Sequence, residues 1–130
     1  MIEPVWIPKE VVLALHQRQV DEHGGDAGIR DETLLESALA RPLQRYAYDS
    51  SADLCALAAS YAKGLAKNHP FIDGNKRTAF VTYRLFLLRN GINATAAQDE
   101  RYATALGLAA GEMEEEAFAT WLRENTAPFS

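Results

Sequence analysis

Residues 51–90 read SADLCALAASYAKGLAKNHPFIDGNKRTAFVTYRLFLLRN, and this stretch decides the fold class. Residues 51–68 and 75–90 are rich in helix-forming residues, with apolar side chains at helical spacing. Between them, Pro70 and Gly74 interrupt the pattern, so we expect one loop joining two long helices. The helix over 75–90 is apolar on nearly all sides, which is typical of a helix near the centre of a domain.

Helical patterns cover most of the remaining chain, whereas strand patterns are weak everywhere. We expect further helices over residues 8–23, 31–41, 99–111 and 114–125. Asp31 is the expected N-cap of the second of these, and Pro42 is expected to end it. The predicted fold is all-α: a compact bundle of about six helices in a single domain over residues 1–130, with the polar loop between two central helices.

The composition is that of an ordinary globular protein, with 48% hydrophobic residues, 24% charged residues and a formal net charge of −5. This acidic balance disfavours broad binding to nucleic acid or anionic membranes, although it is compatible with a small basic pocket. No leader-like segment opens the chain, and no apolar run approaches the length of a membrane span. We therefore expect a cytoplasmic protein with no direct nucleic-acid or membrane partner. Cys55, the single cysteine, is expected to be a buried, inert thiol.

The loop over residues 69–77, HPFIDGNKR, combines groups that suit a phosphate site. A helix begins here, and the free N–H groups of a helix N-terminus attract anions. Gly74 would let a phosphate approach the backbone closely. Lys76 and Arg77 place positive charge in the first turn, where cations cost stability unless an anion lies between them.

His69 and Asp73 flank this expected anion site. A histidine can accept a proton near neutral pH, and an aspartate can hold Mg²⁺ against phosphate oxygens. Taken singly, each residue has an ordinary explanation, since Asp73 could cap the helix and His69 could be a hydrogen-bonded loop residue. Their combination in one turn favours a functional site. A metal site made from these two alone is not expected, because Pro70 prevents a helical pair and neither His16 nor His23 is expected nearby.

The HPFIDGNKR sequence resembles the signature of the Fic/Doc proteins, and the NKR ending followed by Thr78-Ala79 resembles the Doc (death-on-curing) toxin branch. The segments HGGDAGIRDETLLESALARP, FLLRNG and WLREN are also similar to Doc proteins, so the resemblance spans nearly the whole chain. By position, it implies a catalytic base at His69, a buried loop anchor at Phe71 and a Mg²⁺ ligand at Asp73. It further implies phosphate or nucleotide contacts from Gly74, Asn75, Lys76 and Arg77.

Two positions depart from the Fic proteins that transfer AMP. Lys76 stands where those proteins carry glycine, and it adds bulk and charge where an α-phosphate would otherwise lie. Phe80 stands where they carry a second arginine. The absence of that arginine removes one clamp on the β- and γ-phosphates. Doc-type proteins share this pattern and resemble kinases that bind ATP with the γ-phosphate beside the motif histidine.

The resemblance therefore implies the toxin of a toxin–antitoxin pair. Such a protein would use ATP and Mg²⁺ to phosphorylate a serine or threonine of a translation factor, with elongation factor Tu as the expected target. A cognate antitoxin would inhibit it in trans. Two alternatives stay open: transfer of AMP to a protein hydroxyl, and a non-catalytic role in binding a partner.

Two segments outside the motif allow more than one interpretation. The stretch around Tyr46, Ala47 and Tyr48 could be the family's target-docking flap, which holds the substrate by backbone pairing, or an ordinary loop. Residues 24–28, GGDAG, are expected to form a turn, because no Gly-Lys-Ser/Thr follows to complete a phosphate loop. Arg30, just after this turn, could support the site.

The last expected helix raises the question of self-inhibition. Residues 120–125 fit a loose pattern of the inhibitory helix in some Fic proteins, in which Glu124 would pair with the second motif arginine. Phe80 replaces that arginine here, so we expect Glu124 to have a structural setting instead. The acidic run before this helix, residues 112–116, is expected to be a solvated helix start and not a metal site.

Overall fold

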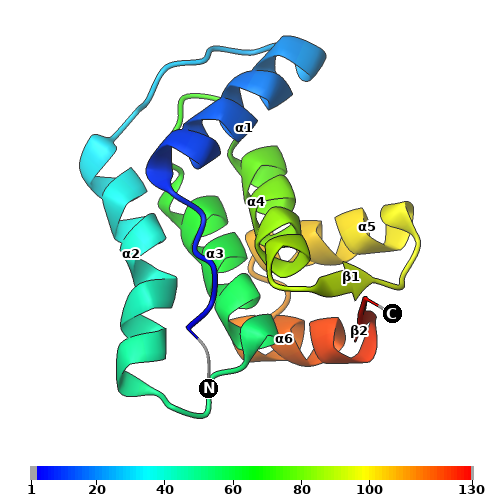
Figure 1. Cartoon of the computed structure of the whole chain (residues 1–130). Helices are drawn as coiled ribbons and strands as arrows, with labels where there is room; N and C mark the ends of the chain where they lie inside the picture. The colour runs from blue at the N-terminus through cyan, green and yellow to red at the C-terminus, as the bar shows by residue number, and fades with distance from the viewer. Residues whose placement is uncertain (1–2, 130) are drawn as a thin grey trace.

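The computed structural model describes residues 3–129, which form six helices and a two-stranded antiparallel sheet (Figure 1). The helices are α1 (Lys9–His23), α2 (Glu32–Tyr48), α3 (Leu54–Asn68), α4 (Asn75–Arg89), α5 (Gln98–Ala109) and α6 (Glu115–Glu124), and the strands are β1 (Ile92–Ala94) and β2 (Thr126–Pro128). The predicted all-α class is confirmed, although the small sheet was not foreseen. None of the helices in residues 3–129 is long and apolar enough to cross a membrane.

Helix α3 lies at the centre of the molecule and packs against α2, α4, α5 and α6 (Figure 1). Its alanine-rich surface lets the neighbouring helices approach closely. A Cβ at Gly64 would lie only 3.3 Å from the main-chain oxygen of Ala38 on α2. On the α4 side, Tyr61 and Phe86 fill the space with their ring centroids 5.1 Å apart. Cys55 is buried in this core, and burial raises the pKa of its thiol.

Local sequence explains where several helices begin and end. Asp31 caps α2 by accepting a 3.0 Å hydrogen bond from the Leu34 N–H, as predicted. Asp53 caps α3 in the same way, accepting from the Ala56 N–H at 2.8 Å. Gly91 follows α4 with φ +83°, the left-handed conformation that terminates helices and favours glycine.

Pro42 does not end α2, contrary to expectation, and lies buried inside the helix. A proline lacks the N–H that would bond to the carbonyl four residues earlier, which here belongs to Ala38. That carbonyl oxygen lies against Gly64 of α3 instead. Beyond Pro42, Tyr46 packs edge-on against Trp6 with ring centroids 5.5 Å apart. Tertiary packing therefore continues the helix past a residue that would stop it in isolation.

Tyr46, Ala47 and Tyr48, expected to be either a docking flap or an ordinary loop, are helical instead, because α2 continues past Pro42. These residues form the last turns of α2, where their backbone groups belong to the helix and offer no free edge for strand pairing. They also lie beside the start of α3, at the opposite end of the molecule from the loop that follows α3 (Figure 1).

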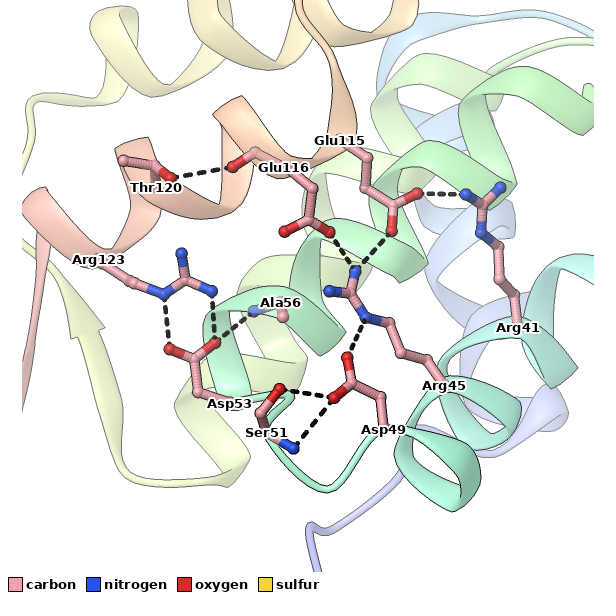
Figure 2. A network of polar contacts seen from close by, with 10 residues as sticks. All are labelled: Arg41, Arg45, Asp49, Ser51, Asp53, Ala56, Glu115, Glu116, Thr120 and Arg123. Carbon is pink, nitrogen blue, oxygen red and sulfur yellow. Dashed lines mark hydrogen bonds and ion pairs between the residues drawn. The ribbon is translucent and has the colours of Figure 1, made fainter.

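A network of ion pairs joins α2 to the start of α6 (Figure 2). The guanidinium of Arg45 lies 3.1 Å from a carboxylate oxygen of Glu115, 2.6 Å from one of Glu116 and 3.7 Å from one of Asp49. Arg41 pairs with the other oxygen of Glu115, whose side chain is only 14% exposed. Glu115 is therefore a partly buried ion-pair partner, which the sequence did not predict, whereas Glu112, Glu114 and Glu116 are exposed as expected of a solvated helix start.

Arg123, near the end of α6, donates two hydrogen bonds to the Asp53 carboxylate, at 2.6 and 3.0 Å (Figure 2). Glu124 follows Arg123, is exposed and lies near the start of α3. The motif loop lies at the other end of α3, whose 15 residues span about 22 Å at 1.5 Å per residue. Phe118 and Leu122 bury the inner face of α6. The packing of α6 and its distance from the motif loop agree with a structural role for this end of the chain's last helix.

Candidate active site

The motif loop joins the end of α3 to the start of α4 through two left-handed residues. His69 is the C-cap of α3, with φ 53° and ψ 51°, and Gly74 is the N-cap of α4, with φ 78° and ψ 17°. The left-handed conformation suits Gly74 but costs a residue with a side chain about 1 kcal/mol. Contacts around His69 must therefore hold it in place.

Asn75 supplies part of that support from inside the loop. Its Oδ1 accepts from the Phe71 N–H at 2.9 Å, and its Nδ2 donates to the Phe71 carbonyl at 2.9 Å and to His69 Nδ1 at 3.1 Å. Because Nδ1 accepts this bond, the neutral His69 ring carries its proton on Nε2 in this structure. The Asn75 side chain is 3% exposed and fully engaged by the loop. Only its backbone N–H, in the first turn of α4, stays available for the predicted phosphate.

His16 of α1 lies directly beneath the loop, contrary to the expectation that neither His16 nor His23 would be near it. Its ring stacks on Phe71 with centroids 3.7 Å apart and planes 9° from parallel, and its Nε2 donates to the main-chain oxygen of Asp73 at 2.7 Å. Phe71, the predicted loop anchor, is fully buried. A signal for His16 exists in hindsight, since it shares helical spacing with Val12 and Val20 on the buried face of α1.

The connection between α1 and α2 runs along the other side of the loop. Arg30 donates from Nε to the His69 carbonyl at 2.7 Å and from Nη2 to the Asn68 carbonyl at 2.9 Å. The Ile72 N–H donates to the Gly28 carbonyl at 3.0 Å. Arg30 thus supports the site as the sequence suggested. This connection pairs with the motif backbone, since Ile29 and Phe71 also form an antiparallel bridge.

Asp73 is exposed at the mouth of the loop. Its Oδ2 accepts a 2.8 Å hydrogen bond from the Asp26 N–H, and within residues 3–129 no hydrogen bond reaches its Oδ1. The described residues contain no cluster of three metal-binding side chains. Mg²⁺ needs none when it binds one or two carboxylates together with nucleotide phosphates. Asp73 fits that arrangement, with one oxygen fixed and the other open.

The loop, the first turn of α4 and Tyr102 of α5 surround a hollow of about 290 Å³. Lys76 and Arg77 line it, and neither forms an ion pair with any carboxylate in the described part of the chain. Gly74 provides no side-chain cap to α4, so the first N–H groups of the helix lack that partner. Cations without a carboxylate partner beside an uncapped helix N-terminus are the features expected of an anion site.

Tyr102 is the one residue of this hollow that lies outside the motif and its first turn. It belongs to α5, and its ring lies edge-on to Phe80 with centroids 5.6 Å apart. Nothing in the sequence marked it, because a tyrosine at helical spacing is ordinarily a packing residue. Only the packing of α5 against α4 brings it to the motif.

Comparison with known proteins identifies the class. The model of the Fic/DOC family matches residues 6–87, and the chain belongs to this family. A protein of Escherichia phage P1 named Protein kinase doc is 35% identical over 117 residues, which cover 90% of this chain and 92% of that protein. A protein of Mycolicibacterium smegmatis named Toxin Doc is 42% identical over 74 residues, 56% of this chain and 57% of that protein. These matches place the chain in the Doc branch, as predicted, and support a toxin with transferase-type chemistry.

Proposed function

We propose that this chain is the toxin of a toxin–antitoxin pair and that it transfers the γ-phosphoryl group of ATP to a serine or threonine hydroxyl of a protein. One observation carries the proposal: unpaired Lys76 and Arg77 stand at the uncapped start of α4, in one hollow with His69 and Asp73. Phosphoryl transfer depends mainly on positioning and on fixed positive charge. The relative named as a protein kinase supports phosphoryl transfer, and the relative named as a toxin supports the role as a toxin.

Each group in the hollow has a role in this reaction. Lys76, Arg77 and the free N–H groups of α4 bind and orient the phosphates. Asp73 would hold Mg²⁺, which neutralises charge on phosphate oxygens when bound. His69 takes the proton of the target hydroxyl as its oxygen bonds to the γ-phosphorus and the bond to ADP breaks. For Nε2 to accept that proton, the ring must move its own proton to Nδ1 and give up the hydrogen bond from Asn75.

Transfer of the γ-phosphoryl group, and not of AMP, is favoured by the surroundings of Phe80. Its ring is half-buried between Tyr83 and Tyr102, with centroids 5.7 and 5.6 Å away, so this position offers no cation to clamp a second phosphate group. Transfer of AMP would use the same hollow and is the alternative reaction.

The partners follow from the same proposal. The expected protein substrate is elongation factor Tu, whose modification would stop translation and arrest growth. The expected inhibitor is a cognate antitoxin acting in trans, because Glu124 lies at the far end of α3 from the motif and has no arginine at position 80 to pair with. ATP and Mg²⁺ are the expected co-substrate and cofactor.

Two labelled forms of ATP test the reaction. The purified protein is incubated with elongation factor Tu, Mg²⁺ and ATP labelled at either the γ- or the α-phosphate. We expect protein-bound label from the γ position alone, and none with a folded His69→Ala variant. Label from the α position alone would establish AMP transfer. A His69→Ala variant that remains as toxic as the wild type would favour the non-catalytic alternative.

A further inference from the structure

We propose that a second hollow, adjoining the motif, binds the nucleoside half of the nucleotide and that Tyr102 stacks on its base; this rests on the proposed function. The second hollow lies between α1, α4 and α5 and has a volume of about 520 Å³. Arg77 and Tyr102 line both hollows, so the two meet at these side chains. A ligand with its phosphates at the start of α4 can therefore extend past Arg77 into the second hollow.

The sizes of the two hollows favour phosphates in the motif hollow and a nucleoside in the second hollow. The motif hollow, at about 290 Å³, lies just below the usual range of roughly 300–1,000 Å³ for small-molecule pockets. Polar and charged side chains dominate its lining, which suits phosphates. The second hollow is larger, and a nucleoside is the remaining part of the nucleotide that needs a place.

The walls of the second hollow have the chemistry of a nucleoside site. Leu15, Phe80 and Val81 supply apolar surface, which suits a flat base and offers no donors to a phosphate. Gln19 and Gln98 supply amides that can hydrogen-bond the edge of a base. Glu22, on the rim contributed by α1, accepts a 3.0 Å hydrogen bond from Arg18 through Oε1, and its Oε2 can accept from ribose hydroxyls. The unpaired cation at the junction, Arg77, marks the side on which the phosphates lie.

Tyr102 is held in position before any ligand arrives. Its ring packs edge-on against Phe80 (5.6 Å, 85°), which packs edge-on against Tyr83 (5.7 Å, 84°), which packs edge-on against Phe118 (5.3 Å, 83°). Tyr83 and Phe118 are fully buried, so this series of rings runs from the cleft into the core. Tyr102 is half-buried and lines both hollows, so part of its ring faces the space that a base would occupy. A ring fixed in advance loses little freedom when it stacks.

Calorimetric titration of the full-length protein separates the two halves of the ligand. MgATP probes both hollows, whereas inorganic tripolyphosphate with Mg²⁺ probes the phosphate site alone. We expect Tyr102→Ala to weaken ATP binding about tenfold, within the range seen when an aromatic stack on a base is removed, and to change tripolyphosphate binding less than about twofold. Tyr102→Phe should retain ATP affinity, because it keeps the ring. Tyr48→Ala, which removes an exposed tyrosine from the far end of the molecule, should leave both ligands unaffected.

Two results would overturn the nucleoside site: an unchanged ATP affinity in a folded Tyr102→Ala variant, or an equal loss for ATP and tripolyphosphate. The outcome is separable from that of the proposed function. If ATP binding depends on Tyr102 but no γ-phosphoryl group reaches a protein, the nucleoside site stands and the proposed function fails. If γ-phosphoryl transfer proceeds and the KM for ATP is the same in wild type and Tyr102→Ala, the proposed function stands and the nucleoside site fails.

Discussion

His16 donates a hydrogen bond from Nε2 to the main-chain oxygen of Asp73, at 2.7 Å, while its ring lies flat against Phe71. A single residue of α1 thus holds both the exposed and the buried part of the motif loop. Because Asp73 is the proposed Mg²⁺ ligand, the geometry of the site depends on how α1 packs against the start of α4.

Replacing His16 with alanine should loosen the loop and weaken the fold. The change removes a buried stacked ring and leaves the Asp73 carbonyl without its donor, at a cost of about 2–3 kcal/mol. Thermal or urea unfolding measures the loss, and γ-phosphoryl transfer should fall with it. His23→Ala, an exposed histidine of the same helix, is the matched control for stability. Equal stability of the two variants would show that His16 does not hold the loop.

Adding a methyl group at Gly74 should cost stability through the backbone alone. An ideal Cβ there would lie 3.6 Å from the His16 ring, an ordinary contact, but φ is +78°. The left-handed conformation should cost alanine about 1 kcal/mol in the free energy of unfolding. Gly107→Ala, in the interior of α5 with nothing within 4 Å of the added Cβ, should instead stabilise by about 0.5–1 kcal/mol. The same sign for both variants would refute the conformational argument.

Removing the Asn75 amide should show whether it positions His69 in addition to stabilising the motif loop. Asn75→Ala leaves the Phe71 N–H, the Phe71 carbonyl and His69 Nδ1 without this partner, so stability should drop by about 2 kcal/mol. Because Asn75 also fixes the tautomer of His69, the pH profile of kcat should move as well. A purely structural residue would lower activity without moving that profile. Asn93→Ala, on the exposed face of β1, serves as the matched control.

Much of the fold could be predicted because local patterns and tertiary packing agree. Asp31 and Gly91 act as the expected helix signals, and the long apolar segments form the central pair of helices. The prediction failed at Pro42, where packing against Gly64 continues a helix that local rules would end. It also missed the sheet formed by β1 and β2, since three-residue strands leave almost no periodic signal.

The chemistry of the site could be read from the motif, but its supports could not. His69, Asp73 and the first turn of α4 are contiguous in sequence, so their proximity follows from one turn. His16 and Tyr102 come from helices distant in the chain, and only three-dimensional packing brings them to the loop. No periodic pattern distinguishes such residues from ordinary packing residues.

The ion pair between Asp53 and Arg123 should make stability depend on pH at the acid end. The hydrogen bond from Arg123 holds the pKa of Asp53 below its ordinary value of 3.8. A lowered folded-state pKa stabilises the fold above about pH 4, and this contribution is lost as the pH falls through the folded-state value. Asp53→Asn keeps an N-cap but removes the charge, and the pair is half-exposed. It should therefore cost about 1 kcal/mol or less at pH 7.

The difference between wild type and Asp53→Asn should shrink as the pH is lowered below about 4, because the wild-type carboxylate then becomes protonated. Unfolding curves at neutral and acidic pH measure it. Arg123→Gln should show the same convergence with wild type, since it removes the other half of the pair. A gap that stays constant across this pH range would mean that the pair contributes nothing through its charge.

The intact mass of elongation factor Tu after incubation with this protein and Mg·ATP tests the central claim most directly. Transfer of the γ-phosphoryl group predicts a gain of one phosphate on a serine or threonine, absent with His69→Ala. A gain of one adenylate would contradict the orientation assigned from Lys76 and Phe80. An unchanged mass, under conditions in which the protein arrests translation, would contradict phosphorylation of this target.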